Sequence, residues 1–309
     1  GCRFAGGSLL QLMDKPRAQR LRTRHLEPFA TDSDGGKLPG GVLSLRRGLR
    51  LLELLGEGEG GWSLADLARQ LEVNKAIALR LLDELRHAAY VYRDDTSETY
   101  HLTYKLSNLG LRKLSQTRVL DQTNGVLREL ANETGELVRL AVVEPEQRLT
   151  WVLAFTGARR SLHIDPNYRL SIGYNTHAAG KAWLAQLPID QVWPILLREG
   201  LEPLTPHTKT DCMAIEADLK QCQVRGFATS DEENELGVRA IAAPITILKL
   251  TGERHCVGVV SVAAPTSRMT QAELEAHAPL LKATVARLGE IWPMDDKSQF
   301  IPPVFKTAH

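Results

Sequence analysis

The sequence predicts an N-terminal winged helix-turn-helix domain, mainly α with a β wing, joined by a linker helix to an α+β domain. Two short helical patterns stand close together at residues 63–87, and two short β-rich runs follow them directly. From residue 136 onward, strand patterns alternate with helical ones, which is typical of an α+β domain. The 309 residues, 43% of them apolar, are enough for two domains with separate cores.

The paired helices carry their own start signals. Ser63 can cap a helix over Leu64–Gln70, and Asn74 can cap a second helix, because both side chains accept hydrogen bonds from free backbone N–H groups. In the second helix, Ala78 and Leu82 belong to an apolar stripe with three- and four-residue steps. We therefore expect one face of this helix on a core and a polar face opposite.

The neighbouring elements complete the winged variant of the motif. Leu45–Leu55 has leucines at helical spacing and is expected to form the first helix. After the paired helices, Tyr90–Arg93 is β-rich, Asp94–Thr99 is a polar turn, and Tyr100–Thr103 returns as a second strand. We assign residues 42–104 to this winged domain.

Bulk charge does not identify a nucleic-acid-binding chain. The net charge is +1, and residues 42–115 hold 11 Lys and Arg against 10 Asp and Glu. Binding to DNA depends on cations placed at phosphates and base edges. Arg80, on the polar face of the second paired helix, is expected to contact DNA; the alternative is an ordinary exposed arginine. The acidic wing tip, Asp94, Asp95 and Glu98, counts against deep engagement of the wing with phosphate.

The two ends of the chain lack periodic patterns. Residues 1–41 mix glycine, proline and arginine and are expected to be a disordered tail, or alternatively an arm that adds attraction to phosphate. Residues 293–309 are expected to be a second, frayed tail. No apolar run approaches transmembrane length and no signal-peptide pattern opens the chain, so we expect a cytoplasmic protein without a membrane partner. The four cysteines lack Cys-x-x-Cys spacing and are expected to be free thiols.

Residues 105–132 are predicted to form the linker helix. Leucines recur among Lys, Arg, Gln and Glu, and no proline interrupts the segment. A leucine stripe outside a compact domain needs a partner to cover it, which predicts a homodimer.

The remaining segment, residues 133–292, has the patterns of a mostly antiparallel α+β domain. Strand patterns cover Leu137–Val143, Leu149–Phe155, Ala240–Leu248 and Val257–Ala263. Helical patterns cover Ala178–Leu187, Ile189–Glu199, Asp211–Val224 and Gln271–Ile291.

Several short strings occur in a characteristic order along both halves. They are SLRRGLRLL at 44–52, LADLA at 64–68, RLL at 80–82, ETGE at 133–136, THAAGKA at 176–182, GVRAIAAP at 237–244 and SVAAP at 261–265. Each string alone is a weak signal, but their order is specific. Over about residues 42–292, the chain resembles the IclR family of bacterial transcription regulators.

The resemblance implies a winged helix that binds double-stranded operator DNA and a GAF-like C-terminal domain that binds a small effector, assembled as dimers or dimers of dimers. The DNA-binding residues expected are Arg46, Arg47, Ser63, Asn74, Lys75, Ala76, Ile77, Arg80 and Arg93. Where such proteins usually show Gly-Leu-Pro-Lys-Ser-Thr, this chain has Glu72–Ile77. Two hydroxyl donors are missing there, so we expect operator contacts to depend on Lys75 and Arg80.

The expected effector site is centred on Thr176–Lys181. Its small residues leave backbone N–H groups uncovered at a helix start, where the carboxylate of a catabolic metabolite can approach. The alternative is that small residues merely allow close packing. With the positions that the resemblance adds, the expected effector-binding residues are Ile164, Ile172, Ala178, Ala179, Gly180, Ser230, Val238, Ala240, Ser261 and Ala263.

The rival class is an enzyme that acts on a small organic acid and uses the winged helix as an interaction module. No nucleophile-base motif supports it, and no catalytic residue, cofactor or metal is expected. Five histidines near carboxylates fit no ligand spacing and are expected to be satisfied or solvated; they are His163, His177, His207, His255 and His277. Asp231–Glu235 is expected to be a solvated acidic loop, with gating of the pocket as the alternative.

Overall fold

The computed structural model of the chain describes residues 42–57, 60–116, 118–145, 147–157, 164, 171–249 and 252–293. The predicted tails, apart from residue 293, lie outside this part of the chain, as do Cys2 and His163. Contacts divide the chain into two compact units, Gly1–Leu106 and Ser107–His309. Within the described residues, no helix is long and apolar enough to cross a membrane.

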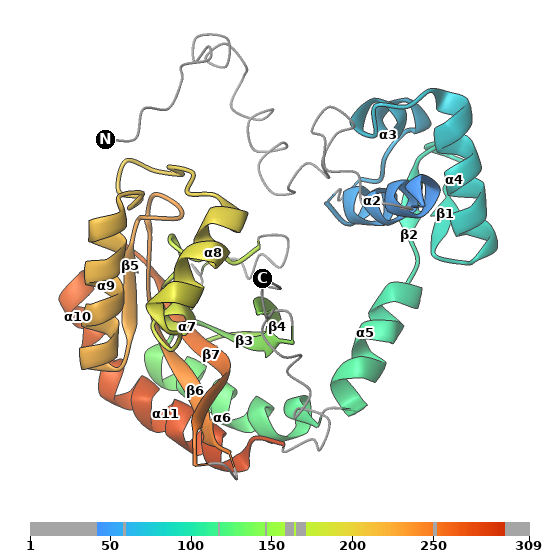
Figure 1. The fold of residues 1–309 in the computed structure, drawn as a ribbon. Helices are drawn as coiled ribbons and strands as arrows, with labels where there is room; N and C mark the ends of the chain where they lie inside the picture. The colour runs from blue at the N-terminus through green and yellow to red at the C-terminus, as the bar shows by residue number, and fades with distance from the viewer. Residues whose placement is uncertain are drawn as a thin grey trace, which may run out of the picture. The chain divides into compact units, whose positions relative to one another are not determined.

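The first unit has the predicted order of three helices and a hairpin (Figure 1). Its elements are α2 (Leu43–Glu57), α3 (Leu64–Gln70), α4 (Lys75–His87), β1 (Val91–Arg93) and β2 (Tyr100–Leu102). Both predicted caps are confirmed: the N–H of Asp66 donates to Ser63 Oγ at 3.1 Å, and the N–H of Ile77 donates to Asn74 Oδ1 at 2.9 Å. Capping is a local interaction, which explains why these two helix starts were predictable.

A small leucine-rich core holds the first unit together. Leu51, Leu67 and Leu82 are fully buried and come from α2, α3 and α4 respectively. The β hairpin closes the core through Tyr100, whose backbone also exchanges two hydrogen bonds with Trp62. The apolar stripe of α4 thus faces the core, as its spacing predicts.

The predicted linker helix is two helices. α5 (Lys105–Gln116) ends before Arg118, whose left-handed φ of 54° interrupts the helix, and α6 (Val119–Thr134) follows. In α6, Leu127 and Leu130 are buried in the core of the second unit. The expectation that these leucines need a second copy of the chain is therefore wrong. By contrast, α5 buries no residue.

The second unit is built on one antiparallel sheet of five strands in the order β4-β3-β7-β6-β5. The strands are β3 (Leu137–Glu144), β4 (Arg148–Thr156), β5 (Ala228–Asp231), β6 (Val238–Leu248) and β7 (Arg254–Pro265). Four of them follow the predicted patterns. β5 was not predicted, because its sequence ATSD is short and has little β-branched or aromatic character.

Helices cover both faces of this sheet (Figure 1). The strands alternate, so that Ala141, Ala242 and Val259 face α7 (Ala178–Leu184), α8 (Ile189–Glu199) and α9 (Cys212–Arg225). Their neighbours Leu140, Ile241 and Val260 pack on the other face with α6, α10 (Gln271–Glu275) and α11 (Ala278–Ile291). The predicted single helix Gln271–Ile291 is interrupted at residues 276–277, and His277 precedes α11.

Candidate functional site

The helix α4 presents two cations without an ionic partner among the described residues. Lys75 and Arg80 are exposed, and neither forms an ion pair there. Arg86, further along the same helix, lies 3.3 Å from Asp83. Lys75 and Arg80 are therefore the cations of α4 that can meet a phosphate or a base edge without first breaking an ion pair.

The remaining predicted cations also differ in whether they form an ion pair. Arg46 and Arg47 on α2 are half-buried and form no ion pair within the described part of the chain. Arg93 on the wing donates to Glu98 at 2.8 Å, so its charge is already paired.

The other four predicted residues have uncharged side chains. Ser63 and Asn74 are occupied as helix caps, and Ser63 Oγ also donates to Asp66 Oδ2 at 2.7 Å. Ala76 is exposed and Ile77 is half-buried. None of these side chains offers a cation, and the Asn74 cap fixes the start of α4, the helix that carries Lys75 and Arg80.

The second unit contains a cavity of about 50 Å³, large enough for more than one water molecule. It lies between the α7–α9 face of the sheet, the start of α7 and the loop that joins β5 to β6. The lining residues are Arg139, Ile164, His177, Ala178, Ser230, Asn234, Glu235, Val238, Arg239, Ala240, Ser261 and Ala263.

Most of the expected effector-binding residues come together at this cavity. Those that line it are Ile164, Ala178, Ser230, Val238, Ala240, Ser261 and Ala263. Ile172 and Ala179 are instead buried in the apolar core. At Gly180, an added Cβ would lie 2.5 Å from Tyr174 Cα. For Ala179 and Gly180, the structure shows the alternative, close packing by small residues.

The polar lining was largely missed by the sequence analysis. Arg139 lies on β3 opposite Ser261 of β7, and its guanidinium sits 4.2 Å from the centre of the Trp151 ring. Arg239 comes from the same strand as Val238, but its guanidinium donates to Asp231 Oδ1 at 2.9 Å and to the carbonyl of Met269 at 2.8 Å, on the sheet face opposite Ala240. The signal that could have revealed Arg139 was a cation within the otherwise apolar run LVRLAVV.

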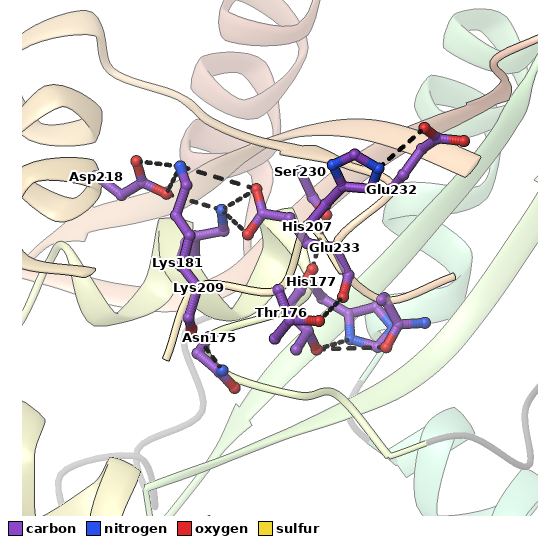
Figure 2. A network of polar contacts seen from close by, with 12 residues as sticks. Asn175, Thr176, His177, Lys181, His207, Lys209, Asp218, Ser230, Glu232 and Glu233 are labelled. Carbon is purple, nitrogen blue, oxygen red and sulfur yellow. Dashed lines mark hydrogen bonds and ion pairs between the residues drawn. The ribbon is translucent and has the colours of Figure 1, made fainter. Parts of the chain in front are cut away.

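His177 is held in one tautomer. The backbone N–H of Gly173 donates to His177 Nδ1 at 3.0 Å, so the proton of the neutral ring is on Nε2. Nearby, Ser230 Oγ donates to the carbonyl of Thr176 at 2.7 Å, which fixes the direction of this hydroxyl (Figure 2). The cavity wall thus includes the Arg139 guanidinium and the imidazole of His177.

The loop after β5 is not the solvated acidic loop that we expected. Glu233 is buried, and Lys181 Nζ lies 2.7 and 2.8 Å from its two carboxylate oxygens (Figure 2). Lys181 also lies 2.9 Å from Asp218 Oδ2, and Lys209 lies 2.6 Å from Asp218 Oδ1. The loop is therefore tied into the interior.

Burial and charge act against each other in this cluster. Burial raises the pKa of Glu233 even though Lys181 opposes the shift. Burial acts in the same direction on Asp218, but Lys181 and Lys209 outweigh it, so the pKa of Asp218 lies below its usual value. Two cations balance two carboxylates here.

These features define a class of protein: a DNA-binding regulator whose winged helix is joined to a domain with a ligand cavity. Residues 44–95 match the IclR helix-turn-helix domain, and residues 111–289 match the family described as bacterial transcriptional regulator IclR C-terminal. The chain belongs to the IclR family of bacterial transcription regulators, which are DNA-binding proteins rather than enzymes.

Individual relatives agree with this assignment. The transcriptional repressor IclR of Escherichia coli K12 is 29% identical over 231 residues, which cover 75% of this chain and 83% of the relative. The structure of an IclR regulator from Alicyclobacillus acidocaldarius superposes with a TM-score of 0.68 at 25% identity, covering 81% and 99% of the two chains. An IclR homologue from Microbacterium hydrocarbonoxydans, solved with 4-hydroxybenzoate, shares the fold at a TM-score of 0.64 and 19% identity, covering 80% and 98%.

Proposed function

We propose that the chain binds operator DNA through α4 and that its cavity binds a small organic acid, a catabolic metabolite, which alters operator binding. The observation that carries this proposal is the donor-rich cavity at the positions expected for an effector. For regulation, the acid must bind the DNA-bound and free states with different affinity, because a ligand without such a difference shifts no equilibrium.

The cavity chemistry supports an acid with a small apolar body. Arg139 and His177 supply donors that suit a carboxylate, and Glu235 is the single carboxylate among the described lining residues. The alanines of α7, β6 and β7, together with Ile164 and Val238, offer apolar contact. A carboxylate on a short aliphatic or aromatic group can bind both the donors and the apolar residues of the wall.

Helix α5 supports the proposal of a homodimer. Leu111 is exposed by 58% and lies one helical turn before Leu114, on the same face of a helix that buries no residue. A second copy of α5 would cover such a face, and two winged helices would then read two operator half-sites. We propose the dimer as the basic unit, with a dimer of dimers as the larger form.

The structure supports a revised division of the chain. We propose that residues 42–104 bind DNA, that α5 is the linker, and that the effector domain begins with α6, since α6 packs in the core of that domain. A regulator of this kind acts where the chromosome is, so we propose a cytoplasmic location.

Selection of bound fragments from a genomic DNA library tests the DNA-binding half of the proposal. We expect enrichment of a sequence with two related half-sites. A panel of acids, with 4-hydroxybenzoate, benzoate and acetate first, then tests the effector half in gel-shift titrations of the selected fragment. An acid that changes fragment binding and is recovered unchanged supports the regulator. Failure to enrich any sequence, or turnover of the acid, would contradict it.

A further inference from the structure

The loop between β5 and β6 supplies one wall of the cavity. Asn234 and Glu235 line the cavity, while the preceding Glu233 points away from solvent and is only 4% exposed. Asn234 Oδ1 accepts from Thr176 Oγ1 at 3.3 Å, next to the cavity residue His177. The position of Glu233 therefore determines where the two cavity residues lie.

Lys181 connects this loop to the opposite wall. Its ammonium contacts both carboxylate oxygens of Glu233, and its backbone N–H donates to the carbonyl of His177 at 3.1 Å. It follows Ala178 on α7 by one helical turn. One side chain thus joins the helix that carries His177 and Ala178 to the loop that carries Asn234 and Glu235.

The loop is also held from its outer side. The hydroxyls of Thr205 and Thr208 each donate at 2.6 Å, to the carbonyls of Glu232 and Glu233 respectively. The N–H of Gly237 donates to Glu232 Oε1 at 2.7 Å. These are bonds to the loop backbone or within the loop. Among the described residues, loop side chains also meet Thr176 through Asn234 and, at 4.0 Å, Lys209 through Glu233. The ion pair with Lys181 is the one that joins a loop side chain to α7 itself (Figure 2).

We infer that Lys181 is a positioning residue for the cavity: through Glu233 it fixes the loop that presents Asn234 and Glu235. The inference that this loop matters for ligand binding rests on the proposed function. Lys181 is 3% exposed, so its removal leaves a buried carboxylate without its main partner. The carboxylate then draws in water, and the loop leaves its place against the cavity.

Hydrogen–deuterium exchange of the full chain tests the positioning role without a ligand. In Lys181→Met and in Glu233→Gln, we expect amides of residues 232–237 to exchange roughly tenfold faster or more than in wild type, because local opening becomes easier. The matched control is Glu136→Gln. Glu136 is 1% exposed and paired with Arg268 at 2.6 Å. It lies two residues before Val138, and therefore on the same face of the sheet, which is the face opposite the cavity.

A double variant separates positioning from overall stability. Lys181→Met/Glu233→Gln removes both buried charges, and Asp218 keeps Lys209 as its partner. We expect the double variant to melt at a higher temperature than Lys181→Met and closer to wild type. Amide exchange in the loop should stay fast, because the ion pair between Lys181 and Glu233 is absent. Wild-type loop exchange in folded Lys181→Met, or an equal rise in Glu136→Gln, would overturn the inference.

Calorimetry with 4-hydroxybenzoate and benzoate tests whether the position of the loop affects ligand affinity. For a probe that wild type binds, we expect affinity to fall roughly tenfold or more in both the single Lys181 variant and the double variant, and to stay unchanged in Glu136→Gln. Unchanged affinity in the double variant would show that the loop does not serve the ligand. If wild type binds neither probe, the result counts against the proposed ligand, and exchange alone decides the role of Lys181.

Discussion

At the scale of single residues, the pairing state of each polar group separates candidate contacts from structural ones. Arg86 and Arg93 are charged like Arg80, yet each already faces a carboxylate. An arginine that must leave an ion pair to reach DNA gains less from the new contact. The sequence shows which residues are charged, but the pairing depends on side-chain geometry.

Arg80→Ala is expected to weaken operator binding by about 1 to 3 kcal/mol if the guanidinium makes a bidentate base contact. The side chain points away from the core, so the fold and ligand affinity should not change. Arg86→Ala on the same helix is the control and should lose less. A gel-shift titration measures both, and equal losses for the two variants would argue against a specific role for Arg80.

Ala178→Leu is expected to abolish ligand binding while operator binding persists, because it places three further carbon atoms into a cavity of about 50 Å³. The neighbouring Ala179→Leu is the matched control: Ala179 is 1% exposed but does not line the cavity, so overpacking should cost about 1 to 3 kcal/mol of stability without filling the site. Calorimetry and thermal unfolding distinguish the two effects. Undiminished ligand binding by folded Ala178→Leu would place the site elsewhere.

The cysteines provide a test of burial. The structure gives Cys212, Cys222 and Cys256 as free thiols, in agreement with the sequence. Burial raises the pKa of Cys222 and Cys256 to about 12. Cys212 is exposed to iodoacetamide, whereas Cys222 and Cys256 are buried and stay protonated, so at pH 8 we expect Cys212 to be modified and the other two to be protected until the chain unfolds. Peptide mapping by mass spectrometry checks this, and rapid labelling of Cys222 in folded protein would contradict it.

At the scale of elements, local signals predicted the winged unit well. Caps and apolar spacing placed α3 and α4, because their determinants lie within a few residues. The linker and the last helix were predicted less well. Leucines at helical spacing do not show which core they join, nor that Arg118 adopts a left-handed conformation.

The two parts of the linker therefore predict opposite mutant behaviour. Leu127→Asp should destabilise the second unit by more than about 2 kcal/mol, since it puts a charge into a fully buried site. Leu111→Asp changes an exposed residue of α5 and should leave the melting temperature unchanged while it weakens the proposed dimer. Sedimentation and thermal unfolding measure the two outcomes. An unchanged dimer in Leu111→Asp would remove α5 from the interface.

At the scale of the whole molecule, the family pattern located the cavity better than it located the groups that give the cavity its chemistry. Ser230, Val238 and Ser261 come from strands that pair in register, so positions in the pattern led to a common place. Arg139 also lies on a paired strand, opposite Ser261, but no string of the pattern includes it, and His177 joins them only through the packing of α7 on the sheet. The tie from Lys181 to Glu233 spans 52 residues, and no local pattern predicts such a contact.

We propose that a small acid in the cavity and operator DNA on α4 change each other's binding affinity. Linkage requires reciprocity: if the acid changes operator affinity by some factor, the operator must change acid affinity by the same factor. The most direct test is fluorescence anisotropy of the selected operator with and without the acid, paired with calorimetry of the acid with and without the operator. In wild type, we predict that the acid changes operator affinity and the operator changes acid affinity by the same factor, and that this factor differs from one. In folded Ala178→Leu, we predict that the acid does not change operator affinity. Equal acid affinity for the free and operator-bound protein would contradict the claim.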